Sequence, residues 1–471
     1  MRNCILMRKS TPSCLWLILF ISLNMSCGKN FLEVKSDRSF TTPSKISDFQ
    51  ALMDNMILMN YGAPNEMLLI GGEEFYITSE IWMGFPAAYN GLPQKNAYLW
   101  AEDIYEREKG VDWNKAYERI LYCNLVLDGL SNMSPEQQEQ SEFDEVKGIA
   151  HFHRAWNYYV LAQAFCKPYE ESSSVFDLGL PLRIEPDVTL TLPRSSLRDL
   201  YGLIIQDLEE SKELLSSRPL VKLRPSKGAA LAMLSKVMMT MGRYEEARSY
   251  GYLSLEEQDS LVDFNTLDAE EIFPFSFDHG ESNPEIIFYT ITNFISIMDD
   301  RRMHINDELL HLYAEDDLRP ALYFMEGSAG NLHFKDINAA TWAYFCGLST
   351  PEVILLVAEA EVRLNNIQTG LNLIDKLLAH RYKEGNIPIY TENLVKKAIL
   401  EMLFEERRRE LAFRGVRWED LRRLNKEQDF QKTLSREIDA QTHILTPNSP
   451  RYVLPIPDVV IELSGIEQNK R

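Results

Sequence analysis

Two stretches of the chain combine flat aromatic rings with carboxylates and amides. Sugars present weakly polar CH faces and many hydroxyl groups, so a site for them uses Trp or Tyr rings for stacking and polar side chains for hydrogen bonds. The first stretch is GGEEFYITSEIWMGFPAAYN, residues 71–90, and the second joins residues 289–294 to NAATWAYF, residues 338–345. The candidate ligand-binding residues in them are Glu73, Glu74, Trp82, Tyr89, Asn90, Tyr289, Phe294, Trp342 and Tyr344.

The alternative for each ring is a place in the hydrophobic core. Trp113 and Trp156 lie on the apolar stripes of predicted helices, and we expect both, together with Trp100, inside the protein. Trp82 lies in a turn-rich loop, and Trp342 directly precedes a segment that reads as a buried helix. The exposure of these last two rings stays open at the level of sequence.

No motif signals catalysis. Residues 71–74, GGEE, match neither the GxGxxG nor the GxxxxGK pattern of phosphate-binding loops, and no GxSxG nucleophile motif is present. His151 and His153 face different ways on a predicted helix, and no carboxylates accompany His304 and His311 at metal-ligand spacing. We therefore expect no catalytic residue, no metal and no cofactor. Because the chain has 70 acidic residues, a glycosidase carboxylate pair stays open as an alternative.

The N-terminus follows the pattern of an export signal. Basic residues at 8 and 9 precede an apolar run from Leu15 to Leu23, and SLNMSCGKN, residues 22–30, places the small Ser26 before Cys27. This resembles a bacterial lipobox, in which the thiol receives a lipid and becomes the mature N-terminus, although Asn24 departs from that pattern. We expect residues 1–26 to be a lipoprotein signal peptide and Cys27 to be the lipidation site. The alternative is an ordinary signal peptide with an incidental cysteine, and Met7 is a second possible start.

The charge of the chain excludes nucleic acids as partners. The formal net charge is −21, and it becomes −24 without the three basic residues of 1–26. Counterion release cannot drive binding of such a chain to a polyanion. The six cysteines, at positions 4, 14, 27, 123, 166 and 346, form no CxxC pair, so they predict neither a zinc site nor a disulfide framework.

Helical periodicity dominates the middle of the chain. Apolar residues recur at three- and four-residue steps over residues 111–130 and 197–215, and the segment 145–165 is apolar on most of its circumference. Two further segments align without gaps, AMLSKVMMTMGRYEEA from Ala232 and LVAEAEVRLNNIQTG from Leu356, so that Gly242 falls opposite Asn365. Each predicts a helix, a tight turn and a second helix, as in tetratricopeptide repeats.

The fold class that follows is mainly α. We expect a scaffold of about four tetratricopeptide-like helical hairpins, with an irregular period. Residues 60–110, 257–345 and 425–471 lack sustained helical periodicity. They should form irregular loops, short strands and short helices over the scaffold, where binding residues tend to lie.

The run ERRRELAFRGVRWEDLRR, residues 406–423, resembles the C-terminal signature of the SusD/RagB family of Bacteroidota outer-membrane lipoproteins. CGKNFLEVKS, WNKAYERILYCN, GLPL from Gly179 and PIP at 455–457 match other parts of that family in the same order. The chain departs from the pattern at Arg414, where the family has Glu, and at Ser349, where it has Arg. On a helix, Glu405 and Glu406 pair with Arg409, and Arg407 pairs with Glu410. This spacing predicts a helix face covered by ion pairs. Gly415 should end this helix, with Arg417 and Trp418 bracing a short helix over 418–424.

The resemblance implies a non-catalytic glycan-binding lipoprotein that captures oligosaccharide at the cell surface. It also implies a partner, a SusC-like TonB-dependent outer-membrane transporter on which the protein acts as a lid. We expect residues 27–471 to form one SusD/RagB-like domain, with an N-terminal part, 27–340, that carries inserted loops and a C-terminal part, 341–471. A lipid anchor at the outer membrane, facing the cell surface, completes the expectation.

Three alternatives remain at the level of sequence. A peptide-binding, RagB-like member of the same family would suit the acidic charge, since cationic peptides meet no repulsion. A surface glycoside hydrolase is less favoured, because no carboxylate pair is signalled. A tetratricopeptide scaffold protein without a surface anchor is the third.

Overall fold

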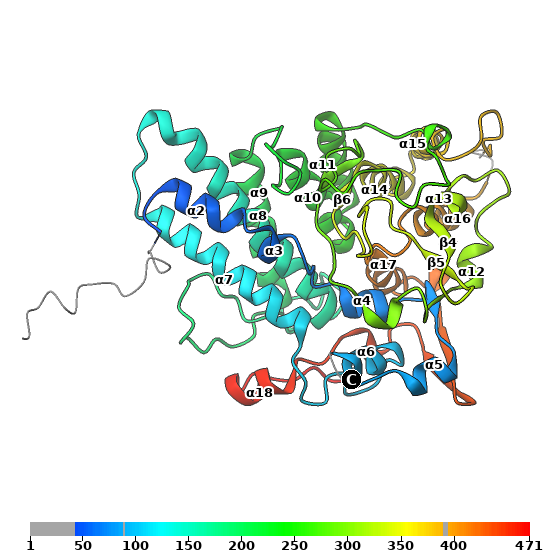
Figure 1. The fold of residues 1–471 in the computed structure, drawn as a ribbon. Helices are drawn as coiled ribbons and strands as arrows, with labels where there is room; N and C mark the ends of the chain where they lie inside the picture. The colour runs from blue at the N-terminus through cyan, green and yellow to red at the C-terminus, as the bar shows by residue number, and fades with distance from the viewer. Residues whose placement is uncertain (1–42, 88–89, 390–393) are drawn as a thin grey trace, which may run out of the picture. The chain divides into compact units, whose positions relative to one another are not determined.

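The long helices of the computed structural model pack against one another in chain order (Figure 1). The structure describes residues 43–87, 90–389 and 394–471, and residues 45–471 form one compact unit. The main helices are α7 (Val111–Ser131), α8 (Gln140–Phe165), α9 (Leu197–Leu214), α10 (Lys227–Met241), α11 (Tyr244–Glu257), α14 (Thr350–Arg363), α15 (Ile367–Leu378), α16 (Lys396–Glu410) and α17 (Val416–Leu424).

Hairpin packing confirms the predicted helical scaffold. Helix α7 packs on α8, α8 on α9, α10 on α11, and α14 on α15, while α11 against α14 joins two of the hairpins across the long insertion between them. Helix α8 is buried along most of its length, as its sequence predicts. Trp100, Trp113 and Trp156 all lie in the main hydrophobic cluster, which confirms their expected place in the core.

The two aligned segments form the same turn. Gly242, with φ of 76°, and Asn365, with φ of 69°, both adopt the left-handed conformation between the helices of their hairpins. In each turn the following amide closes back on the helix: Arg243 N–H donates to the Met238 carbonyl at 2.9 Å, and Asn366 N–H donates to the Glu361 carbonyl at 2.8 Å. This bonding pattern ends α10 and α14 at equivalent positions, so the repeat inferred from sequence is a structural one.

Short elements fill the rest of the described chain. The strands form four antiparallel pairs: β1 (Phe75–Tyr76) with β3 (His304–Ile305), β2 (Ile286–Phe288) with β6 (Leu348–Ser349), β4 (Phe324–Glu326) with β5 (Leu332–Phe334), and β7 (Leu434–Ile438) with β8 (Gln441–Leu445). The short helices are α2 (Ile46–Met53), α3 (Met56–Met59), α4 (Glu66–Gly71), α5 (Ser79–Gly84), α6 (Gly91–Tyr98), α12 (Asp307–Leu310), α13 (Arg319–Tyr323) and α18 (Asp458–Ser464). In the part of the chain that the structure describes, every helix is either too short or too polar to span a lipid bilayer.

The charged signature of α16 is buried rather than solvated. Arg319 donates to Asp317 at 2.7 Å, to Glu406 at 2.5 Å and to Glu410 at 3.0 Å, and Arg381 joins Glu410 to Glu285. The predicted pair between Glu406 and Arg409 is present at 2.8 Å. The predicted pair between Arg407 and Glu410 is replaced by contacts with other segments, because Arg407 reaches Asp420 on α17 at 2.8 Å. The signature therefore ties α16 to distant parts of the chain.

The turn after α16 also differs from the prediction. Helix α16 ends at Glu410, and residues 411–414 separate it from Gly415, whose φ of 76° places it at the start of α17. Gly415 thus opens the second helix instead of closing the first. The two departures from the family pattern contact each other here, since Arg414 Nη1 donates to Ser349 Oγ at 2.9 Å.

The second charged cluster includes Glu73 from the first candidate stretch. Arg417 Nε donates to Glu73 at 2.8 Å, Lys432 Nζ lies 3.0 Å from its carboxylate, and Arg408 lies 3.7 Å away. Burial opposes ionisation of Glu73, but these three cations outweigh it and lower its pKa to about 2. The pKa of Glu74 is shifted in the opposite direction, because burial raises it to about 7. Both carboxylates stabilise the junction with α17 rather than facing solvent.

We predict that the turn glycine is required for its backbone conformation alone. A Cβ at Gly242 would meet only the Tyr244 hydroxyl, at 4.0 Å. Gly242→Ala should therefore lower the free energy of unfolding by about 1 kcal/mol, the penalty for a left-handed non-glycine residue. Gly242→Asn is the matched control, since Asn365 occupies the equivalent turn, and it should lose less than half as much in urea unfolding. Equal losses for the two variants would contradict this explanation.

We predict that Glu73→Gln destabilises the protein in a pH-dependent way. At pH 7 the free energy of unfolding should fall by about 3 kcal/mol, because three cations lose their shared counter-charge. The lowered pKa means that this contribution is complete above about pH 5 and is lost as the pH falls towards about 2. The free energies of unfolding of wild type and variant, measured in urea, should therefore become equal as the pH is lowered.

Glu308→Gln is the control for the Glu73 variant. Glu308 contacts the same Lys432 at 2.6 Å, but its side chain is 64% exposed. Its loss should change the free energy of unfolding by less than about 1 kcal/mol at any pH. A Glu73→Gln defect that stays constant between neutral and acidic pH would count against the electrostatic origin.

Candidate functional site

Two segments of the second aromatic stretch lie side by side and enclose a cavity. Thr292 N–H donates to the Tyr344 carbonyl at 2.9 Å, and Cys346 N–H donates to the Thr290 carbonyl at 2.9 Å, which extends the pairing of β2 with β6. Beyond this ladder lies a cavity of about 320 Å³, called the Trp342 cavity below. It is lined by Phe294, Ile295, Met298, Asp299, Asp300, His333, Trp342 and Tyr344.

Two aromatic rings of this cavity are open to solvent. Trp342 is 51% exposed and Phe294 is 60% exposed, although both are large apolar side chains. The rings of Phe273 and His333 pack beside Trp342, with centroids 5.2 and 5.9 Å from its own, so the indole is held in place. Braced, half-exposed rings of this kind suit stacking against the CH face of a ligand.

Polar groups of the cavity complement the rings. Hydrogen bonding from Ser328 lowers the pKa of Asp300, so its carboxylate is charged and can accept hydrogen bonds at neutral pH. Burial lowers the pKa of His333, which is neutral, and its Nδ1 has no hydrogen-bond partner among the described residues. Asp299 is already engaged, because Arg301 lies 3.1 Å away and Arg302 contacts the same oxygen. The hydrogen-bonding capacity left for a ligand therefore lies on the second carboxylate oxygen of Asp300 and on His333 Nδ1.

Tyr344 forms the floor of the Trp342 cavity. It is buried, and its hydroxyl donates to the Met298 carbonyl at 3.0 Å. Its ring stacks with those of Phe334 and Phe413, at centroid distances of 6.2 and 6.0 Å. Tyr344 therefore shapes the cavity. Its hydroxyl is hydrogen-bonded within the protein and does not face a ligand.

Several candidate ligand-binding residues are buried in the structure. Glu73 is buried in the ion cluster at α17, and Glu74 is buried with its carboxyl group accepting from Phe413 N–H at 2.6 Å. Tyr289 is buried with its hydroxyl donating to the Ala339 carbonyl at 2.8 Å. The expectation that these three face a ligand is corrected, because each has its polar atoms engaged within the fold. Tyr89 and Cys27 lie outside the described residues.

Of the remaining candidates in the first stretch, Asn90 supports the segment before Asp299 and Trp82 lies apart from the cavity. Asn90, with φ of 65°, begins α6, and its amide donates to Glu66 at 2.8 Å. Gln94 also donates to Glu66, and its carbonyl oxygen accepts from Ser296 Oγ and Ile297 N–H, both at 3.0 Å. This network holds the segment that precedes Asp299. Trp82 is half-buried beneath Lys95, whose Nζ lies 4.3 Å from the ring centroid, and it does not line the Trp342 cavity.

Sequence reasoning missed Asp300 and His333. Asp300 follows Asp299 in a run that looks like solvated surface, and His333 lies on β5, far from the aromatic stretches in sequence. Only the pairing of β4 with β5, which sets Met325 opposite His333, brings that histidine to the cavity. Across residues 43–87, 90–389 and 394–471, no three His, Cys, Asp or Glu side chains converge in a way that could hold a metal ion.

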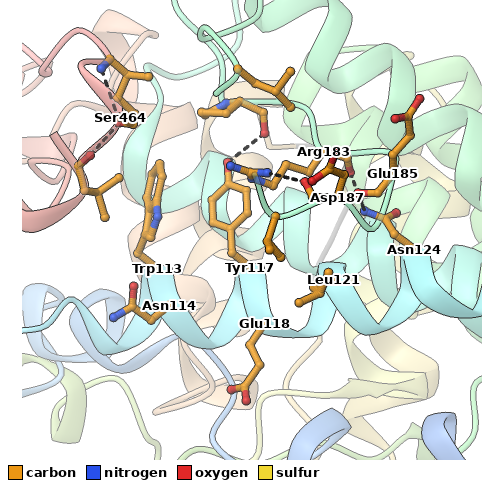
Figure 2. A pocket seen from close by; sticks show the side chains of 15 residues that line it. Trp113, Asn114, Tyr117, Glu118, Leu121, Asn124, Arg183, Glu185, Asp187 and Ser464 are labelled. Carbon is orange, nitrogen blue, oxygen red and sulfur yellow. Dashed lines mark hydrogen bonds between the residues drawn. The ribbon is translucent and has the colours of Figure 1, made fainter. Parts of the chain in front are cut away.

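A second cavity, of about 370 Å³, lies along α7 (Figure 2). Figure 2 shows Trp113, Tyr117 and Leu121 projecting from α7 towards the segment that carries Arg183 and Asp187. Its polar groups mostly bond the protein's own backbone: Tyr117 Oη donates to the Pro181 carbonyl at 3.0 Å and Asn124 Nδ2 to the Arg183 carbonyl at 3.0 Å. The Trp342 cavity, with free polar groups beside exposed rings, is therefore the stronger candidate.

Comparisons with known proteins agree with this architecture. A family model described as starch-binding associating with outer membrane matches residues 30–239, and the SusD family model matches residues 350–470. A SusD-like protein P2 from Formosa agariphila is 23% identical over 379 residues, which span 66% of this chain and 71% of that protein.

Solved structures show the same fold. A SusD superfamily protein from Bacteroides fragilis is 19% identical, with a TM-score of 0.71 over 90% of this chain and 99% of that one. A SusD-like carbohydrate binding protein from Bacteroides vulgatus is also 19% identical, with a TM-score of 0.66 over 90% of this chain and 97% of that one. The chain belongs to the SusD/RagB family, whose members are binding proteins of the Bacteroidota outer-membrane surface.

Proposed function

We propose that this protein is a non-catalytic, glycan-binding member of the family that captures oligosaccharide in the Trp342 cavity. The observation that carries the proposal is the pair of half-exposed rings, Trp342 and Phe294, beside a charged Asp300 and an unpartnered His333 nitrogen. Rings stack on the CH faces of a sugar, while the carboxylate accepts hydrogen bonds from its hydroxyl groups. The carbohydrate-binding and starch-binding descriptions of its relatives support the same class of ligand.

The cavity favours binding over hydrolysis. A glycosidase needs two carboxyl groups with separate roles, one acid and one base or nucleophile. The two carboxylates that line the cavity are neighbours in sequence, and Asp299 is held by Arg301 and Arg302. A carboxylate oxygen that already accepts from two guanidinium groups is engaged within the protein, so Asp299 is not free to act as the acid or the base. This arrangement supports a binding role without chemistry.

The proposal extends to the place of the protein in the cell. Residues 1–26 act as a lipoprotein signal, Cys27 carries the lipid, and residues 27–471 form one domain with its parts at 27–340 and 341–471. The protein closes as a lid over a SusC-like TonB-dependent transporter and delivers the bound oligosaccharide. Family membership supports this role, since SusD/RagB proteins work at the outer-membrane surface with such partners.

We predict that Trp342→Ala weakens oligosaccharide binding by about tenfold or more, as expected when a stacking ring worth over 1 kcal/mol is removed. Isothermal titration calorimetry against a panel of neutral oligosaccharides measures the change. Phe176→Ala is the matched control, because Phe176 is also an exposed ring but lies outside the Trp342 cavity. It should bind as wild type does.

The same titrations separate the alternatives. Binding of mixed peptides, with none of the oligosaccharides bound, would replace the glycan ligand by a peptide. Release of reducing sugar by the purified protein, abolished in Asp300→Asn, would contradict the non-catalytic role.

We predict that Cys27→Ser abolishes lipid attachment in the native host. Radiolabelled palmitate should enter the wild-type protein and not the variant, because only the thiol can accept the diacylglycerol group. The variant should be lost from the outer-membrane fraction, while the wild type co-purifies with a TonB-dependent barrel in mild detergent. Equal labelling of both proteins would overturn the assignment of Cys27, and a wild type that purifies without a barrel would overturn the lid role.

A further inference from the structure

A third cavity lies where two helices end beside the C-terminal tail. It has a volume of about 360 Å³ and is called the Arg422 cavity here. Lys167 and Pro168 follow the end of α8, Arg422 and Asn425 lie at the end of α17, and Tyr452 and Lys470 belong to the tail. None of these residues lines the Trp342 cavity.

Three buried polar side chains of the Arg422 cavity have unused hydrogen-bonding capacity. Arg422 Nε has no hydrogen-bond partner within the described residues, and Asn425 Nδ2 and Tyr452 Oη contact only each other. Each side chain is at most 2% exposed. Native proteins pair more than nine-tenths of such groups, and each orphan costs about 1–3 kcal/mol. Arg422 Nε–H and the hydroxyl proton of Tyr452 are both left over at one cavity, which calls for a common explanation.

All three groups are hydrogen-bond donors. Asn425 Oδ1 accepts from Lys432 N–H at 2.9 Å, which fixes the orientation of the amide and leaves Nδ2 as the end that contacts Tyr452. Burial raises the pKa of Tyr452 to about 12, so its hydroxyl keeps its proton and can donate. The guanidinium Nε–H of Arg422 is always a donor. Such a set suits a ligand atom that only accepts, as the oxygens of an anion do.

The charge of the lining points the same way. Lys167, Arg422 and Lys470 line the cavity, and among the described residues no carboxylate does. Lys167 is paired with Asp177 at 2.7 Å, whereas Lys470 is exposed. The Arg422 guanidinium also covers the carbonyls of Gln163 and Cys166 at the end of α8, so these do not repel an anion. The chain has a net charge of −21, so a cavity lined by cations and by no carboxylate is opposite in sign to the protein as a whole.

Apolar side chains supply much of the remaining lining, together with Asn448 and Ser449. Pro168, Pro450, Val453 and the Tyr452 ring surround the donors, and that ring is fixed against Trp418 at a centroid distance of 4.8 Å. We propose that the Arg422 cavity binds a small organic acid through its carboxylate, with a compact apolar body against these walls. The two oxygens of one carboxylate provide about four acceptor sites for the buried donors and Lys470. This site is separate from the proposed oligosaccharide site and does not depend on it.

Calorimetric titration with benzoate tests the site. Wild type should bind benzoate with a Kd of about 1 mM or lower, and uncharged benzamide at least about tenfold more weakly. Tyr452→Phe keeps the ring and removes one donor, and Lys470→Met removes an exposed charge, so both variants should fold and raise the Kd by about fivefold to tenfold. Lys397→Met, which removes an exposed lysine elsewhere, is the matched control and should bind as wild type does.

Further titrations determine which kind of acid binds and at which cavity. Glucuronate carries the same carboxylate on a polar sugar body, and we expect it to bind more weakly than benzoate. Tighter binding of glucuronate would overturn the apolar part of the proposal. No binding of either acid, or equal binding in Tyr452→Phe, Lys470→Met and wild type, would overturn the site. Benzoate binding must also survive in Trp342→Ala, because its loss there would assign the acid to the Trp342 cavity.

Discussion

The fold depends on a buried network of arginine and carboxylate side chains around α16. Arg319 and Arg381 are fully buried, and both contact Glu410, which links Asp317 and Glu285 from separate loops to the same helix. Removing one member of such a network leaves a buried charge without a partner, whereas the complete set fixes the geometry of every segment that supplies a residue. The loops that insert between α11 and α14 are therefore held to the scaffold by charge as well as by apolar packing.

This constraint reaches the Trp342 cavity through the turn after α16. Phe413, with φ of 59°, lies in that turn, and its ring stacks on Phe334 at 4.6 Å and on Tyr344 at 6.0 Å. Its amide donates to Glu74, which belongs to the first aromatic stretch. Phe413, a residue of the family signature, thus supports the floor of the Trp342 cavity. Its role there is to position the site.

Sequence alone could predict the elements but only part of the site. Periodicity identified α7, α8 and α9, and the gapless alignment found the equivalent turns at Gly242 and Asn365, because both signals are local. Residue type singled out Phe294 and Trp342, and both line the Trp342 cavity. Asp300 and His333 were missed because they reach the cavity only through the folding of the 294–344 segment. Glu73 was misplaced because its partner Arg417 lies 344 residues away in the sequence. Residue type shows that a side chain is able to bind a ligand. Only tertiary contacts show whether that side chain is already bonded to another part of the protein.

The same distinction separates the buried arginines from one another. Arg119 donates to the carbonyls of Leu58, Tyr61 and Gly62, and Arg436 donates to backbone carbonyls while lying 3.9 Å from the centroid of the Tyr98 ring. Burial lowers the pKa of both to about 10. Arg422 also binds carbonyls, at the end of α8, yet its Nε is left without a partner in the described chain, and it lines a cavity with Lys470. Carbonyls satisfy donors but do not neutralise the charge, so an arginine held in this way keeps an attraction for an anion that a carboxylate-paired arginine such as Arg319 has lost.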